Sequence, residues 1–145
     1  MVLKMLEQFF QPKSIAVIGA SRNPMNAGHG VLKSLLKGGV LSSPTNKAFK
    51  GKVFPVNPNA SFILGKKSYK KVTDILGKVD LAVIAVRAAL VKEVIIDCAK
   101  KSVKGVIIIA AGFGESGEQG KKLESEIKEL ARKSKIRIIG PNCLG

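Results

Sequence analysis

Short runs of consecutive apolar residues alternate along this chain with segments in which apolar residues recur at helical spacing. The apolar runs predict five buried strands, at residues 14–18, 52–56, 81–86, 106–110 and 136–139. Helical spacing predicts three helices between the strands, over residues 27–37, 91–99 and 116–133. Strands that alternate with helices form parallel sheets with right-handed crossovers. We therefore expect an α/β fold, a doubly wound parallel five-stranded sheet of the Rossmann type with strand order 3-2-1-4-5.

Individual residues refine this pattern. Pro55 has no backbone N–H to donate, which indicates an edge position or a strand end for the second strand. The third strand is apolar throughout, which indicates that both of its faces are covered. The pair Gly38-Gly39 is expected to end the first helix. Ser116 with Gln119 fits a capping box for the last helix.

The size of the chain and its few cysteines restrict the class of protein. A length of 145 residues suits one domain, which we place at residues 1–145. No apolar run approaches the ~20 residues that cross a bilayer, and the first residues lack the layout of a signal peptide. Cys98 and Cys143 are too few for a disulfide scaffold or a zinc site. We therefore expect a soluble, cytoplasmic domain with no membrane partner and no metal.

The charge of the chain is strongly positive and unevenly distributed. Twenty-five Lys and Arg against ten Asp and Glu give a net charge of +15. Residues 1–73 hold twelve basic residues and one acid, whereas residues 74–145 hold thirteen and nine. Such a field favours a polyanionic partner, either a nucleic acid or a phosphate-rich cofactor. Nucleic acid fits less well, because aromatic residues make up only 5% of the chain and no basic helix or arm is present.

A candidate phosphate site follows the first predicted strand. The turn reads Gly19-Ala20-Ser21-Arg22-Asn23-Pro24 and leads to Gly28-His29-Gly30. Small residues let the backbone approach a phosphate, and the following helix offers free N–H groups and the positive end of its dipole. Ser21 and Asn23 can add hydrogen bonds and Arg22 can add a charge, so this turn predicts phosphate binding.

This part of the sequence lacks the residues of an NAD site, which restricts the possible phosphate ligands. An NAD site needs Gly-x-Gly-x-x-Gly and an acid about 20 residues later. Here Ser21 and Pro24 replace two of those glycines, and no acid lies between Glu7 and Asp74, so NAD is disfavoured. Basic residues near the second strand suit an additional phosphate on the ribose, namely Lys47, Lys50 and Lys52. Both NADP and coenzyme A (CoA) carry such a phosphate, and the residues leave both open.

The other strand ends supply further candidates on the same edge of the sheet. These segments are Val86-Arg87-Ala88, Ala110 to Glu115 with Gly112 and Phe113, and Gly140 to Gly145 with Asn142 and Cys143. His29 is the only histidine, which excludes a histidine dyad and a histidine-based metal site. Beside glycines it is expected to be a loop residue or a weak phosphate contact. Cys143 has no accompanying general base, and Cys98 is expected to be packed on a helix. We therefore predict no catalytic residue in this chain.

Five separated blocks of sequence point to a family. They span almost the whole chain in order: Phe9 to Arg22, Pro55 to Pro58, Val79 to Ile84, Ala110 to Phe113 and Ile138 to Gly145. Together they resemble the CoA-binding domain of ADP-forming acyl-CoA synthetases and, more distantly, the alpha subunit of succinyl-CoA synthetase. The resemblance implies a Rossmann-type domain that binds CoA or acyl-CoA.

The resemblance also implies partners. Enzymes of this family are acid–CoA ligases that interconvert acyl-CoA, ADP and phosphate with the acid, ATP and CoA. Their phosphate passes through a histidine of a later domain, and an ATP-grasp domain or subunit binds ATP. This chain alone is therefore expected to bind CoA without catalysing a reaction. Two alternatives stay open at this point: a stand-alone CoA-binding regulator and a fragment of an NADP-binding reductase. The sequence also leaves open whether the chain forms a homo-oligomer.

Site residues are carried over from the resemblance by position. The pyrophosphate is expected at Gly19, Ala20, Ser21, Arg22 and Gly28, and the 3′-phosphate at Lys52, with Lys50 second. The adenine is expected toward Asn57 and the end of the third strand. The adenosine and the pantetheine arm are expected to be flanked by Val86, Arg87, Ala88, Gly112 and Phe113. Asn142 and Cys143 are expected near the thiol. Arg87 stands where the family usually has proline, and Asn26 where a lysine is common.

Overall fold

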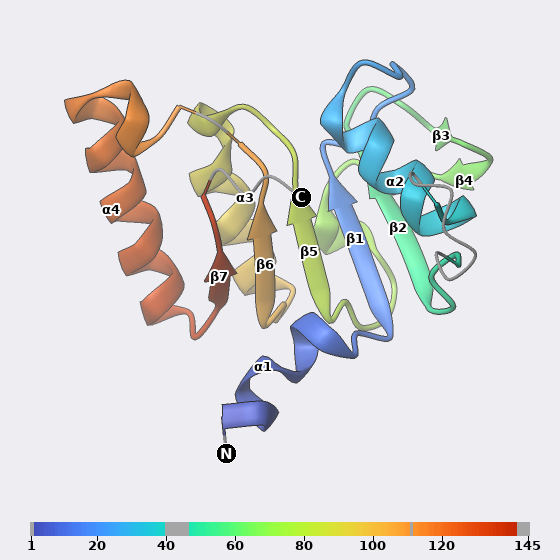
Figure 1. Ribbon diagram of the computed structural model, residues 1–145, viewed down its shortest axis with the longest axis horizontal. Helices are drawn as coiled ribbons and strands as arrows, with labels where there is room; N and C mark the ends of the chain where they lie inside the picture. Colours follow the sequence, from blue (N-terminus) through green and yellow to red (C-terminus); the bar gives the residue numbers. More distant parts are fainter. Residues whose placement is uncertain (1, 40–46, 111, 142–145) are drawn as a thin grey trace.

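Five parallel strands form the central sheet of the molecule (Figure 1). The computed structural model describes residues 2–39, 47–110 and 112–141. The strands are β1 (Ser14–Ile18), β2 (Lys52–Val56), β5 (Leu81–Ile84), β6 (Gly105–Ile108) and β7 (Arg137–Ile139). Every pairing between neighbours is parallel, which confirms the expected α/β class.

The strand order is β2-β1-β5-β6-β7, so the predicted order 3-2-1-4-5 is wrong. The third main strand, β5, pairs with β1 instead of extending the sheet beyond β2. Pro55 explains this choice, because a residue without an N–H is tolerated at an edge and would cost a ladder hydrogen bond in the middle of a sheet. The wholly apolar β5 takes the central place, where both of its faces are buried. The result is the other common doubly wound order, 2-1-3-4-5.

The segment between β2 and β5 differs from the predicted pattern of strand and helix. Residues 57–80 form a two-stranded hairpin, β3 (Phe62–Ile63) and β4 (Lys66–Lys67), followed by a single turn of 3₁₀ helix, η1 (Val72–Asp74). Val72, Ile75 and Val79 of this segment join the main core. The crossover from β2 to β5 is therefore made without a long helix.

Four α-helices accompany the sheet in the described part of the chain. They are α1 (Val2–Phe10), α2 (Ala27–Lys37), α3 (Ala88–Lys100) and α4 (Glu118–Lys133). The predicted bounds of α2 are confirmed, and its end at Gly38 has the positive φ of 74° that favours glycine. The predicted capping box is wrong: α4 begins at Glu118 with Gly117 as its N-cap, and Ser116 belongs to a preceding 3₁₀ turn, η2 (Gly114–Ser116). Within these described ranges, no helix combines the length and the apolar character needed to cross a bilayer.

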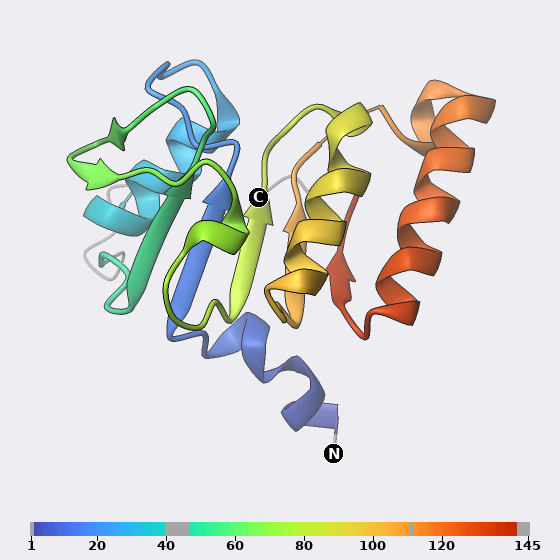
Figure 2. The same cartoon turned by 180° about the vertical axis from the view of Figure 1, so that it is seen from behind.

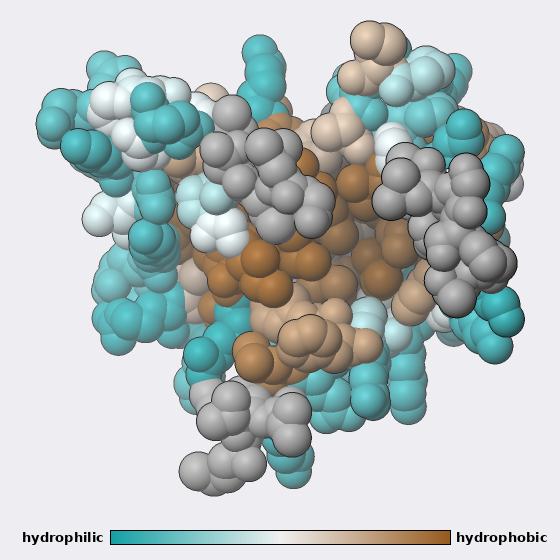
Figure 3. Space-filling model, viewed as in Figure 1, coloured by the Kyte–Doolittle hydropathy of each residue, from teal (hydrophilic) through white to brown (hydrophobic). Residues whose placement is uncertain are grey.

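The two faces of the sheet are covered unequally. On the face seen in Figure 2, here called the back face, η1, α3 and α4 pack over the sheet and form the main core with Ala16, Ala82 and Val106. On the face seen in Figure 1, the front face, α2 covers β1 and β2, and α1 lies across the lower end of the sheet. Figure 3 shows apolar residues gathered in the middle of this front face.

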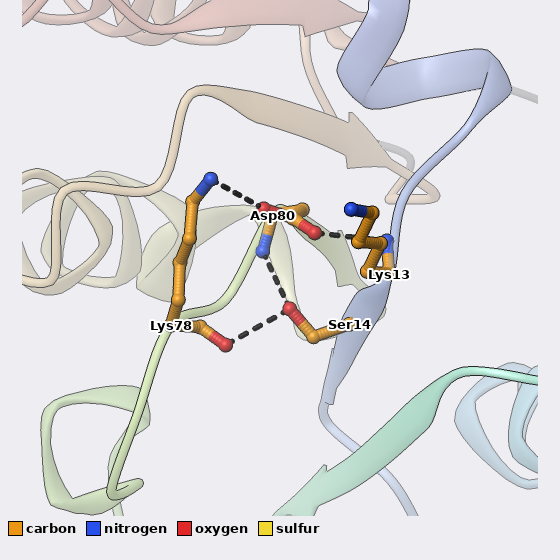
Figure 4. Close-up of polar contacts among 4 residues, drawn as sticks. All are labelled: Lys13, Ser14, Lys78 and Asp80. Atoms are coloured by element: carbon orange, nitrogen blue, oxygen red, sulfur yellow. Dashed lines mark hydrogen bonds and ion pairs between the residues drawn. The ribbon is translucent and has the colours of Figure 1, made fainter.

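Asp80 joins the amino ends of β1 and β5 (Figure 4). Its Oδ2 accepts a hydrogen bond from the backbone N–H of Lys13 at 2.8 Å, and its Oδ1 lies 3.0 Å from Lys78 Nζ. The backbone N–H of Asp80 donates to Ser14 Oγ at 3.0 Å, and that hydroxyl donates to the carbonyl of Lys78 at 2.9 Å. Burial raises the pKa of Asp80, but the hydrogen bonds from Lys13 and Lys78 and the charge of Lys78 outweigh it and hold this pKa below its ordinary value.

We expect Asp80→Asn to lower the free energy of unfolding by about 1 kcal/mol at neutral pH, because the charge-assisted hydrogen bonds become neutral ones. The folded-state pKa lies below the unfolded one. The stabilisation is therefore complete above the ordinary carboxyl pKa of about 3.9 and is lost as the pH falls through the lower, folded-state pKa. Urea unfolding at several pH values measures this. A difference between the two proteins that does not shrink in acid would contradict the assigned role of the charge.

Candidate functional site

A cleft of about 570 Å³ opens at the carboxyl ends of three neighbouring strands. Gly19 follows β1, Asn57 follows β2, and Val86 and Arg87 follow β5, and all four residues line the cleft. The chain leaves β1 toward β2 on one side and later returns to β5 on the other, so the cleft lies at the switch point of the sheet. Ligands of open α/β sheets bind at such a point.

The turn after β1 is held by contacts that leave no room for larger residues. Gly19 has a φ of 92°, and a Cβ on Gly28 would lie only 2.0 Å from the carbonyl oxygen of Gly19. Asn57 Nδ2 donates to the carbonyl of Ala20 at 2.8 Å. His29 Nδ1 lies 2.8 Å from the carbonyl oxygen of Ser21, which can only accept, so Nδ1 carries the proton. The expectation that His29 is a loop residue is wrong: His29 lies in the first turn of α2, where it is buried.

Backbone N–H groups are what the turn offers to a ligand. Those of Ala20 and Ser21 have no acceptor among the described residues, and α2 begins at Ala27 with its positive dipole end. The side chains of this segment are used locally: Ser21 Oγ accepts from the N–H of Asn23 at 3.0 Å, and Asn26 Oδ1 accepts from that of Gly28 at 2.9 Å. The turn can therefore bind an anion through its backbone.

The opposite side of the cleft is basic. Lys70 and Lys71, from the segment between β4 and η1, line it together with Arg87. Lys71 Nζ lies 3.8 Å from Asp97 Oδ2, whereas Lys70 and Arg87 have no carboxylate partner in the described ranges. Glu93 and Asp97 of α3 add two acids to the same wall. Neither lysine was predicted as a site residue, because the position of both depends on the path of residues 57–80, which the sequence pattern does not indicate.

The structure brings together only part of the predicted site. Five of its members line the cleft: Gly19, Ser21, Asn57, Val86 and Arg87. Five others lie near the cleft-lining residues without lining the cleft: Ala20, Arg22 and Asn23 in the turn after β1, Gly28 in α2, and Ala88 at the start of α3. Arg22 is directed to the hairpin, where its Nε donates to the carbonyl of Phe62 at 3.3 Å. Asn142 and Cys143 lie outside the described residues.

Lys50 and Lys52 are not brought to the cleft. Lys52 is the first residue of β2 and pairs with Ser14 at the start of β1, at the opposite edge of the sheet from Gly19. The strand between Lys52 and the cleft explains this separation, and Lys50 precedes Lys52 on the same side.

Gly112 and Phe113 are also not cleft residues. The Phe113 side chain is fully buried in the main core, and the N–H groups of both residues donate to Glu115 Oε1, at 2.6 and 3.2 Å. The carboxylate of Glu115 therefore occupies backbone N–H groups of the turn after β6 that could otherwise bind a ligand.

Reactive groups are scarce in the described part of the chain. The expectation that Cys98 is packed on a helix is confirmed: it is buried on α3, and burial, with a smaller effect of Asp97, raises the pKa of its thiol to about 12. A thiol with that pKa stays protonated and is a poor nucleophile. The described residues contain no group of three or more His, Cys, Asp or Glu side chains that could hold a metal ion.

Comparison with known proteins gives consistent matches. A family model described as a CoA binding domain matches residues 13–145. The alpha subunit of ADP-forming acetate–CoA ligase II from Pyrococcus furiosus is 49% identical over 142 residues, which cover 97% of this chain and 29% of that subunit.

Solved structures agree in fold. A crystal structure from Pyrococcus horikoshii OT3 has a TM-score of 0.86 and 49% identity, and it covers 97% of this chain and 30% of that one. A dinucleotide-forming acetyl-coenzyme A synthetase 1 of Ca. Korarchaeum cryptofilum, in complex with phosphate and ADP, has a TM-score of 0.84 and 43% identity, with 97% and 28% covered. The chain spans less than a third of the length of these relatives.

Proposed function

The chain belongs to the CoA binding domain family, and from that premise we propose that the cleft at the ends of β1, β2 and β5 binds CoA. The observation that carries the proposal is the pairing of two anion sites in one cleft. The turn after β1 offers backbone N–H groups, and the wall opposite offers Lys70, Lys71 and Arg87. CoA carries phosphate at two separated places, in its pyrophosphate and on its ribose.

We assign the pyrophosphate to the turn at Ala20 and Ser21 and the 3′-phosphate to the basic wall. Lys70 is the principal candidate there, because Lys71 already has a carboxylate partner in Asp97 and Lys70 has none in the described ranges. A lysine acts on a phosphate as a point charge on a flexible stem, so it tolerates small differences in ligand position. Leu90 and Val94 of α3 line the same wall and supply apolar surface for an adenine ring.

Titration of the chain with CoA, 3′-dephospho-CoA and NADP tests the assignment. Lys70→Ala is expected to weaken CoA binding by about tenfold, or about 1.4 kcal/mol, and to leave dephospho-CoA binding nearly unchanged. Lys52→Ala is the matched control, since Lys52 lies at the far edge of the sheet, and it is expected to leave both affinities unchanged. Calorimetry measures all three ligands on all three proteins.

Three results would contradict these assignments. If Lys70→Ala lowered the affinities for CoA and dephospho-CoA equally, Lys70 would not be the residue that binds the 3′-phosphate. If Lys52→Ala lowered the affinity for CoA but not for dephospho-CoA, the sequence-based expectation that Lys52 binds the 3′-phosphate would hold. Tighter binding of NADP than of CoA would overturn the function itself and favour a reductase fragment.

We further infer that this unit serves an ADP-forming acid–CoA ligase, as the name of the Pyrococcus furiosus relative suggests. The reaction would then need a phosphate-carrying histidine and an ATP-binding part from other domains or subunits. His29 is not a candidate for the first role, because it is buried and its Nδ1 is hydrogen-bonded to the turn. The acid that is activated would be selected by those other parts, since the described cleft offers two anion sites and no third.

A further inference from the structure

The front face of the sheet is left open at one end. Residues Val17, Val83, Ile107 and Ile139 are aligned across β1, β5, β6 and β7 and lie on this face. Their exposure rises along the row, from 0% at Val17 and 6% at Val83 through half-buried Ile107 to 41% at Ile139. The matching row on the back face is better covered, with Ala16, Ala82 and Val106 all at 0% and Ile138 half-buried.

The cause of this gradient is the distribution of the helices. The two crossovers that lead into β6 and β7 place α3 and α4 on the back face, as right-handed connections require (Figure 2). On the front face α2 reaches β1 and β2, and α1 reaches the lower end of the sheet (Figure 1). Gln8 and Phe9 of α1 lie over Gly105 at the start of β6, and no described element covers the front of β7 or the carboxyl end of β6. Ile107, Ile109 and Ile139, here called the open front patch, are therefore left partly exposed.

We propose that the open front patch is the docking surface for the polypeptide that accompanies this unit in the full-length ADP-forming ligases. This inference rests on family membership and not on where CoA binds. A contiguous apolar area on an uncovered part of a sheet face is typical of an interface. The Pyrococcus furiosus subunit and the Pyrococcus horikoshii protein each carry more than twice the length of this unit in addition to it, so both contain chain that can cover the patch.

Two observations favour this occupant over a second copy of the chain. A net charge of +15 on each molecule opposes self-association, whereas a partner of lower charge meets no such barrier. Ile139 is also the last residue of β7, at the edge of the sheet, so any polypeptide that follows β7 starts beside the patch. The partner surface is therefore expected to be apolar at its centre and acidic at its rim.

A chimera tests the proposal. In it, this chain replaces the matched 142 residues of the Pyrococcus furiosus subunit. Ile139→Asp puts a charge into the patch, and Leu76→Asp is the matched control, because Leu76 is 89% exposed and lies outside the patch. We expect Ile139→Asp to lower the unfolding temperature of this unit by about 5 °C more in the chimera than in the isolated chain, since a charge buried against apolar surface is costly. Leu76→Asp is expected to have the same small effect in both.

Every other outcome overturns the docking proposal. Equal shifts for Ile139→Asp in chimera and isolated chain mean that nothing covers the patch. A chimera that does not fold means that the partner surface does not fit this unit. A dimer of the isolated chain that Ile139→Asp dissociates would show that a second copy is the occupant. CoA titration of isolated Ile139→Asp is expected to match the unsubstituted chain, so a failed interface and a failed CoA site remain distinguishable.

Discussion

Gly28→Ala is expected to weaken CoA binding by about 100-fold, or about 2.8 kcal/mol, and to destabilise the fold by about 2–4 kcal/mol. The added Cβ would lie 2.0 Å from the carbonyl oxygen of Gly19 and 2.7 Å from its carbonyl carbon. Both atoms belong to backbone, so no side chain can rotate away. The start of α2 must then move off the turn, and the N–H groups of Ala20 and Ser21 lose their alignment. Calorimetric titration with CoA and urea unfolding measure the two effects.

Gly30→Ala is the control for this substitution. Gly30 lies in the same helix two residues later, and a Cβ there meets nothing within 4 Å. Alanine in a helix is favoured over glycine, so Gly30→Ala is expected to stabilise the chain by up to about 1 kcal/mol and to leave CoA affinity unchanged. If both alanines weakened CoA binding alike, the close approach of α2 to the turn would not be the reason.

Ser21→Asp is expected to weaken CoA binding by at least about tenfold, or about 1.4 kcal/mol. Ser21 lines the cleft, and its Oγ accepts from the N–H of Asn23 at 3.0 Å. An aspartate can accept the same hydrogen bond, so the turn is kept while a negative charge is placed against the ligand phosphates. The repulsion is electrostatic, so the loss is expected to shrink as the salt concentration rises.

Ser21→Asn separates charge from shape. Asparagine has nearly the size of aspartate and offers the same acceptor to Asn23, without the charge. We expect Ser21→Asn to bind CoA within about threefold of the unsubstituted chain. Equal losses in Ser21→Asp and Ser21→Asn would indicate crowding in the cleft and would place the phosphates away from this turn.

The strands were predictable because a strand that is buried on both faces has consecutive apolar residues, a pattern that is uncommon in exposed segments. The bounds of β1, β2 and α2 agree with the predicted ones, and the other strands differ by up to two residues at an end. The strand order was not predictable from the alternation of elements, since both common orders share it. Pro55 carried the missing information, because it identifies β2 as an edge strand and thereby places β5 beside β1.

The candidate site was predictable only where it lies close to a strand end. Gly19, Ser21, Asn57, Val86 and Arg87 follow strands directly, so their edge of the sheet is fixed by the topology. Lys52 was assigned by its charge and by the resemblance, although as the first residue of β2 it lies at the opposite end of the strands from the cleft. Lys70 and Lys71 are brought to the cleft by a hairpin and a single 3₁₀ turn, which leave no clear periodicity in the sequence.

The crossover from β2 to β5 has a mechanical consequence. It carries Lys70 and Lys71 on one wall of the cleft but lacks a long helix of its own, and the ion pair between Lys71 and Asp97 is a tie from it to α3. A nucleotide bound between the two walls would form a second link between this crossover and the rest of the domain. Amide protons in the hairpin and the 3₁₀ turn are then expected to exchange more slowly once the cleft is filled, so hydrogen exchange in this crossover would report ligand binding.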